Sequence, residues 1–179
     1  MIVLVVIPPF TRKWYRNHST KYAPPASMSS WKKFSSPEGK FSVWFPGAPE
    51  YTNVIVSTHL GDIQQSCFFV WVDKQNEYAV NYCDYPERLN LTPNQQFDLS
   101  QAAVSKKFGK IVFQKDLKLG DDPGREFEFA VGGKGNFSGR VRIILAEKRL
   151  YQMMVIFLTV NPHPMDRATF FNSFKILAN

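Results

Sequence analysis

Short hydrophobic segments alternate with polar positions and turn residues through the second half of the chain. Residues 125–131 carry Phe127 and Phe129 at alternate positions between charged neighbours, and glycine-containing turns flank this segment. Side chains two positions apart lie on the same face of a strand, so this alternation is typical of a half-buried β-strand. Residues 110–160 therefore predict three or four consecutive strands, and the short turns between them indicate antiparallel pairing.

The stretch from residue 65 to residue 84 predicts a β-hairpin. Pairing Asp73 with Glu77 leaves a loop of three residues, which is a common hairpin length. This register aligns Val70 with Val80 on a continuous apolar face. A slip of one residue would exchange the two faces, so the apolar match is the reason to prefer this register.

Two helices are expected, one in the middle of the chain and one near its end. Thr92 has the features of an N-cap, because Pro93 follows at the first helical position and Gln95 completes a capping box. Gly109 is a natural C-terminal stop for this helix. The second helix is expected near residues 165–174, where phenylalanines supply its buried face.

Earlier strands are expected at residues 31–35, 40–45 and 52–59. Together with the hairpin and the later series, they bring the expected total to about six to eight strands. The helices follow the early strands and end the chain, which is typical of an α+β fold. The sequence therefore predicts a central antiparallel sheet covered by two helices.

The net charge of +7 is distributed unevenly along the chain. Residues 1–40 carry seven basic groups and one acidic group, whereas residues 41–179 carry 15 basic and 14 acidic groups. A nucleic-acid-binding domain needs its positive charge on a folded face, so this distribution argues against a nucleic-acid partner. A basic arm that meets a membrane surface or an acidic protein partner is the better interpretation.

We expect residues 1–30 to be an apolar stub and a basic, Pro/Ser-rich arm, followed by one α+β domain over residues 31–179. The apolar stretch at residues 2–7 is too short for a transmembrane helix, which needs about twenty residues. No basic segment precedes it, so it is not a complete signal peptide. It is either a tail without consequence or the remainder of a longer leader lost through a misassigned start.

Several segments resemble a domain family found in many uncharacterised bacterial proteins. They are residues 31–47 (WKKFSSPEGKFSVWFPG), 123–127 (PGREF), 149–152 (RLYQ) and 170–175 (FFNSFK). More distantly, the strand order and the aromatic-rich strand that ends in Phe45 and Pro46 resemble the PsbP/Mog-like fold. The resemblance covers the chain from Trp31 onward and implies a central antiparallel sheet between helices.

The resemblance also implies a class of function. PsbP proteins are extrinsic subunits of photosystem II on the lumenal side, and Mog-type members bind the small GTPase Ran. Neither group is enzymatic, so the resemblance implies a binding module. Together with the near-neutral domain, the basic arm favours a location outside the cytoplasm or at a membrane periphery. No functional residue of either group matches a position of this chain, and no site is carried over.

Two glycine-containing loops invite a ligand-binding interpretation. Residues 132–136 lack the Gly-Lys-Ser/Thr ending of a phosphate loop and join two strands, so we expect a hairpin loop. Asp121 and Asp122 are too few for a calcium site, which needs six or more oxygen ligands. A tight turn explains these two acids better, and we expect no metal site and no cofactor.

The charged residues around Phe127 invite a catalytic interpretation. Arg125, Glu126 and Glu128 are expected to form the solvated face of a strand, with the acids paired to Arg140 and Arg142 across a hairpin. Proton transfer needs a partner group, and neither a histidine nor a second catalytic acid is recognisable nearby. We therefore expect no catalytic residue.

Cys67 and Cys83 are the only cysteines, and no C-x-x-C motif accompanies them. In the predicted hairpin register they face each other, where a disulfide is feasible with some local adjustment. The alternative is two reduced, buried cysteines, which is the commoner state in a cytosolic protein. Export would favour the disulfide.

The leading hypothesis is a non-enzymatic binding or protein-interaction module that is extracytoplasmic or extrinsic to a membrane complex. The alternative is a carrier of a small apolar ligand in a cleft between sheet and helix. An enzyme ranks third. The partner, the compartment and the oligomeric state stay open.

Overall fold

The computed structural model describes residues 30–58, 61–72, 76–85, 90–130, 137–158 and 164–177. The predicted N-terminal arm lies outside the described residues except for Ser30. The predicted hairpin loop at 132–136 also lies outside them.

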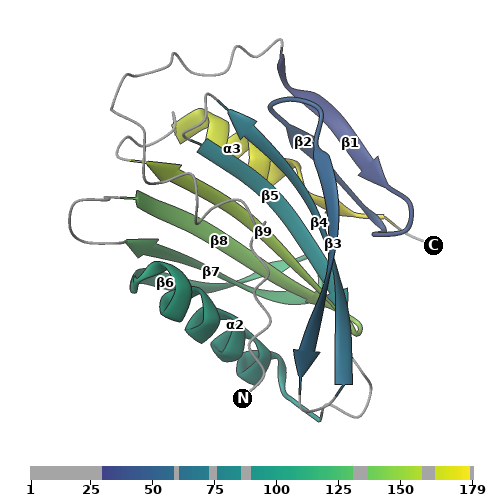
Figure 1. Cartoon of the computed structure of the whole chain (residues 1–179), viewed down its shortest axis with the longest axis vertical. Coiled ribbons are helices and arrows are strands. Elements are labelled where there is room, and N and C mark those ends of the chain that lie inside the picture. The colour runs from purple at the N-terminus through teal and green to yellow at the C-terminus, as the bar shows by residue number, and fades with distance from the viewer. Residues whose placement is uncertain are drawn as a thin grey trace.

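A seven-stranded antiparallel sheet forms the centre of the fold, with the strand order β3-β4-β5-β9-β8-β7-β6. Its strands are β3 (Glu50–Thr58), β4 (Gly61–Val72), β5 (Asn76–Asp84), β6 (Lys110–Leu119), β7 (Asp122–Ala130), β8 (Phe137–Ala146) and β9 (Arg149–Leu158). The sheet confirms the predicted α+β class and the predicted number of central strands (Figure 1).

A second, three-stranded sheet packs on one face of the large one. It consists of β1 (Lys32–Ser36), β2 (Phe41–Phe45) and β10 (Lys175–Ile176), with β2 in the middle. The sequence predicted β1 and β2 but not this separate sheet, because its third strand comes from the far end of the chain.

The two helices of the described residues cover opposite faces of the large sheet, as predicted. Helix α2 (Pro93–Phe108) packs on β6 and β7, while α3 (Pro164–Ser173) packs on β2 of the small sheet. Figure 1 shows α2 beside β6 and β7, and α3 near β1 and β2 on the other side. Alternate residues of β4, β5, β8 and β9 therefore contribute to two separate hydrophobic cores.

The capping box predicted for α2 is present. The backbone N–H of Gln95 donates to Thr92 Oγ1 at 3.3 Å, and the N–H of Thr92 donates to Gln95 Oε1 at 2.9 Å. Both bonds satisfy N–H groups that a helix start leaves without intrahelical partners. The helix ends at Gly109, whose N–H donates to the Ser105 carbonyl at 3.0 Å.

Aromatic packing fills the core on the α3 side. Phe170 lies fully buried, with its ring centroid 5.4 Å from that of Tyr78 in an edge-to-face arrangement. Phe41 stacks on Phe174 at 5.7 Å between centroids. These contacts join α3, the small sheet and the large sheet into one core.

The predicted register of the β4–β5 hairpin is wrong by two residues. Val70 lies opposite Tyr78, and Trp71 lies opposite Glu77. A shift of two residues keeps every side chain on its predicted face, so the apolar pattern alone does not distinguish the two registers.

Candidate functional site

Three neighbouring strands carry a row of charged side chains on the α3 side of the large sheet. We define this charged face by Phe113 and Lys115 of β6, Glu126 and Glu128 of β7, and Arg140 and Arg142 of β8. The strand register places these residues in two cross-strand rows. One row is Lys115–Glu126–Arg142, and the other is Phe113–Glu128–Arg140.

Glu126 is the centre of the first row. Its side chain is only 1% exposed, and it accepts two hydrogen bonds from Arg142, at 3.0 Å from Nε and 2.7 Å from Nη2. Lys115 Nζ lies 3.3 Å from its other oxygen. Burial alone would raise the pKa of Glu126, but the hydrogen bonds and charge of Arg142, with Lys115 and Arg140, outweigh burial and lower it.

Glu128 pairs with Arg140 in the second row. Arg140 Nε donates to Glu128 Oε1 at 2.7 Å, and Nη2 contacts the same oxygen. Both side chains are about one-third exposed, so solvent reaches this pair. Phe113, beside Glu128 in the register, exposes 42% of its surface.

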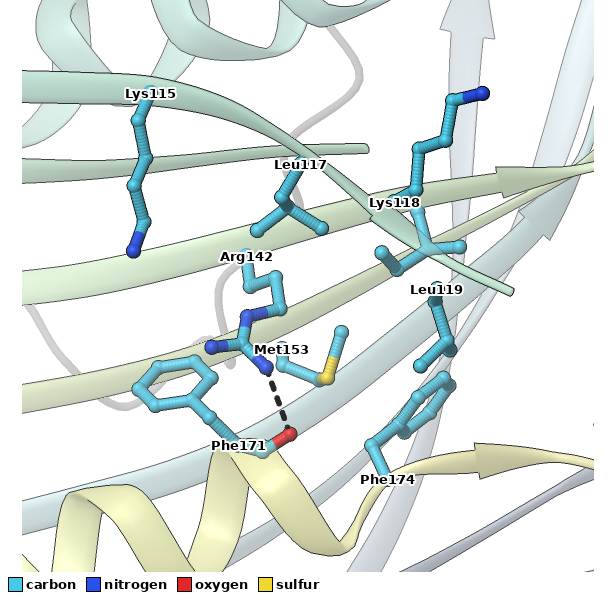
Figure 2. A pocket seen from close by; sticks show the side chains of 9 residues that line it. Lys115, Leu117, Lys118, Leu119, Arg142, Met153, Phe171 and Phe174 are labelled. Atoms are coloured by element: carbon cyan, nitrogen blue, oxygen red, sulfur yellow. Dashed lines mark hydrogen bonds between the residues drawn. The ribbon is translucent and has the colours of Figure 1, made fainter. Parts of the chain in front are cut away.

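Arg142 also joins the sheet to α3. Its Nη1 donates to the Phe171 carbonyl at 2.9 Å, and its guanidinium lies 5.1 Å from the centroid of the Phe171 ring (Figure 2). A cation at the last turn of a helix is favourable because the helix dipole is negative there. All of these contacts fix Arg142 in place as a structural part of the charged face.

Two hollows flank the charged face. The first, of about 210 Å³, opens between β6 and α3, and Figure 2 shows Leu117, Leu119 and Phe174 around it, with Lys115 at one side. The second, of about 320 Å³, lies at the other end and includes Arg167 of α3. Its lining residues are Val112, Glu128, Phe129, Ala130, Ser138, Gly139, Phe157 and Arg167.

The charged face, together with Arg167 of the second hollow, carries a net positive charge. Lys115, Arg140, Arg142 and Arg167 supply four positive charges, and Glu126 and Glu128 supply two negative charges, which gives +2. Lys115 has a side-chain exposure of 54%. The arrangement therefore presents a rigid, mixed-charge surface with an exposed aromatic residue at its margin.

The predicted pairing of the two β7 acids with the β8 arginines is confirmed, but the predicted solvation of the segment is wrong. Glu126 is buried, and its carboxylate lies among the cationic groups of Lys115, Arg140 and Arg142. Arg125 points to the α2 side, where its Nε donates to Asp116 at 2.7 Å and its Nη1 contacts Asp98 of α2. Strand parity places Arg125 on the same side as Phe127, which is where α2 packs.

Cys67 and Cys83 share a face, but they are not opposite each other. Cys67 lies opposite Asn81, and Cys83 lies opposite Gln65. Both thiols are free and buried. Diagonal positions are about 7–8 Å apart, so the observed register favours the reduced alternative over the disulfide, and a thiol count has to decide between them.

Neither thiol has the environment of a reactive cysteine. Burial, and secondarily the charge of Asp84, raises the pKa of Cys83 to about 12. Burial also raises the pKa of Cys67 well above its usual range. Nucleophilic cysteines need a lowered pKa, so both thiols act as small apolar core residues.

Glu77 is a buried acid that sequence reasoning missed. It lies fully buried on the α2 side of β5, and neither carboxylate oxygen has a hydrogen-bond partner among the described residues. Burial raises its pKa to about 8, and Lys107 of α2 only partly opposes this shift. In the predicted register Glu77 closed the hairpin, whereas the shift of two residues moves it inward, opposite Trp71.

Asp121 and Asp122 lie at a turn, as predicted. Gly120 has a φ of +63°, a conformation that glycine adopts without strain. Within the described residues, no group of three or more His, Cys, Asp or Glu side chains is placed to hold a metal ion. No helix in that part of the chain is long and apolar enough to cross a membrane.

Comparison with solved structures shows the fold. The solution structure of cyanobacterial PsbP (CyanoP) from Synechocystis sp. PCC 6803 is similar with a TM-score of 0.53 and 11% identity, over 87% of this chain and 98% of that one. The immunity protein TplEi of Pseudomonas aeruginosa, complexed with "L" peptide, has a TM-score of 0.42 and 13% identity, over 90% of this chain and 58% of that one. No family model and no curated protein matches this chain. The likeness to PsbP supports the predicted PsbP-like resemblance as a resemblance of fold.

Proposed function

We propose that the chain is a non-enzymatic protein-interaction module that binds a protein partner through the charged face. The observation that carries this proposal is the two-row array of charges beside the exposed Phe113. Aromatic residues and arginines are enriched at protein interfaces, where fixed charges select the partner and its register. The net charge of +2 favours an acidic surface on the partner.

The array is also rigid, which lowers the cost of binding. Arg142 is held by Glu126 and by the Phe171 carbonyl, so its side chain is already ordered before a partner arrives. Lys115 and Phe113 remain exposed on the edge strand β6. These two side chains are therefore the parts of the charged face that a partner meets first.

A double variant tests the proposal. Phe113→Ala with Lys115→Gln removes the exposed aromatic ring and one cation from β6. The matched control is Trp44→Ala with Lys33→Gln, because Trp44 is also 42% exposed and lies opposite Lys33 on β2 and β1. Chemical cross-linking in the native host, followed by quantitative mass spectrometry, measures partner retention for each form.

The proposal predicts that specific protein partners are depleted at least fivefold with the β6 double variant and retained with the control. Equal retention by the wild type and both variants contradicts it. Thermal unfolding of each variant confirms that the fold is intact before retention is compared. A form that lacks residues 1–29 adds a separate test of the basic arm, which we propose contributes to a membrane-peripheral or extracytoplasmic location.

A small-ligand carrier is the second candidate. The observation in its favour is the first hollow, whose walls include Leu117, Met153 and Phe174. Its volume of about 210 Å³ is below the roughly 300–1,000 Å³ typical of ligand pockets. The adjoining hollow of about 780 Å³ is large enough, but charged residues make up much of its lining, so the carrier of an apolar ligand ranks second. Native mass spectrometry that shows no co-purified small molecule removes this candidate.

A further inference from the structure

Arg167 lies on α3 beside the second hollow, and its side chain is half-buried. Its guanidinium carbon lies 5.6 Å from the centroid of the Phe157 ring. Its Nε is buried and has no hydrogen-bond partner among the described residues. Buried donors in native proteins are nearly always hydrogen-bonded, so the partner of this donor lies outside the described residues.

The neighbouring arginines of the charged face differ from Arg167. Arg140 donates from Nε to Glu128, and Arg142 donates from Nε and Nη2 to Glu126. Their guanidinium groups are used within the fold. The Nε of Arg167 is instead a donor that a ligand can engage.

The second hollow combines this donor with a hydroxyl group and apolar walls. Ser138 supplies the hydroxyl, and Phe157 is part of the apolar wall. Glu128 also lines the hollow, but its carboxylate already accepts hydrogen bonds from Arg140. Among the described residues, the guanidinium of Arg167 is therefore the charge lining the hollow for which no ion pair is found.

The local electrostatics favour one negative charge in this position. Burial lowers the pKa of Arg167, the nearby charge of Arg140 lowers it further, and Glu128 only partly opposes both. An anion beside Arg167 would compensate its charge. A doubly charged phosphate would bring excess negative charge towards Glu128, whereas a singly charged carboxylate would not.

We propose that the second hollow binds a carboxylate, with Arg167 as the principal donor and Ser138 as a second donor. The planar guanidinium matches a carboxylate in geometry, and the apolar walls accept a neighbouring apolar group. The carboxylate belongs to an Asp or Glu side chain of the protein partner, next to an apolar residue. This inference rests on the proposed function and names the chemistry of the partner segment.

Two decapeptides with acetylated N-termini and amidated C-termini test the inference. They are identical except that one carries Leu-Glu and the other Leu-Gln at its centre. Fluorescence anisotropy measures their binding to the full chain, to Arg167→Gln and to Lys175→Gln. Lys175 is a matched control because it is an exposed cation on β10 that does not line the hollow. The ¹⁵N–¹H resonance of Arg167 Nε reports contact at the donor itself.

We expect the Glu peptide to bind at least about tenfold more tightly than the Gln peptide, because a charge-assisted hydrogen bond supplies a difference of that size. Arg167→Gln should abolish this preference and Lys175→Gln should retain it, while the Arg167 Nε resonance shifts with the Glu peptide only. Equal affinity for both peptides, an unchanged preference in Arg167→Gln, or no binding of either peptide overturns the inference.

Octanoate and octanamide distinguish a free carboxylate from one on a protein. If octanoate binds in an Arg167-dependent manner and the Glu peptide does not, the protein source is overturned. The β6 double variant leaves Arg167 unchanged, so the chemical cross-linking experiment can still support the interaction module when the carboxylate site fails.

Discussion

Replacing Glu77 with glutamine tests whether the protein carries a buried, protonated acid. Burial raises the pKa of Glu77 from 4.5 to about 8, so the folded state holds a proton that the unfolded state releases. Stability should therefore fall as the pH rises through the window between these two values, and it should level off above pH 8. The neutral Glu77→Gln side chain removes this pH dependence.

The magnitude follows from the size of the window. Each pKa unit corresponds to about 1.4 kcal/mol, so the wild type should lose roughly 3 kcal/mol of unfolding free energy between pH 5 and pH 8 through this group alone. The full burial of Glu77 means that solvent does little to screen this effect. The difference in unfolding free energy between Glu77→Gln and the wild type should therefore change by the same amount between pH 5 and pH 8.

Urea unfolding at pH 5, 6, 7 and 8 measures this difference. Glu50→Gln is the matched control, because Glu50 is an exposed glutamate on a strand of the same sheet. A difference between Glu77→Gln and the wild type that does not vary with pH refutes the reasoning. Such a flat difference is the result expected if Lys107 keeps Glu77 ionised, because the carboxyl would then titrate below this pH range.

Four further predictions concern stability, the thiols and the arm. Phe170→Ala should lower the unfolding free energy by about 3–5 kcal/mol, because it empties a fully buried aromatic site, and chemical denaturation measures the loss. Thr92→Ala should cost about 1 kcal/mol in the same assay, since it removes the α2 cap. A thiol count under denaturing, non-reducing conditions should find Cys67 and Cys83 reduced, and a count of zero would show that the strands rearrange to form the disulfide. Limited proteolysis should cleave before Trp31 and then stop, whereas equal resistance along the chain would show that the arm is folded into the domain.

Local signals predicted much of the fold. The alternation around Phe127 identified β7, and the Thr92–Gln95 capping box identified the start of α2. Both features depend on residues within a few positions of one another. Patterns of this kind report strand faces and helix ends directly.

Features that depend on distant partners were not predictable in the same way. The small sheet pairs Ser42 with Lys175, which comes from the far end of the chain. The β4–β5 register and a register two residues away place the same side chains on the same faces, so Glu77 was assigned to the hairpin end. Its burial follows from pairing on both sides, with Trp71 of β4 and Ile156 of β9.

The sequence predicted the ion pairs of the charged face, but it did not predict that this face lies beside α3 and Arg167. Opposite charges on adjacent predicted strands indicated that the acids pair with Arg140 and Arg142. The structure assigns Glu126 to Arg142 and Glu128 to Arg140. The position of Arg167 beside them depends on how α3 packs against the sheet. Sequence spacing contains no information on that packing.

Site-specific photo-cross-linking in the native host tests the charged face as the interaction surface most directly. A benzophenone amino acid at Val112, which is 59% exposed at the margin of the charged face, reports contacts there. The same group at Ile55, 67% exposed on the opposite edge strand β3, is the matched control. The account predicts a defined protein adduct from position 112 and none from position 55. Adducts from position 55 with none from position 112 would contradict it.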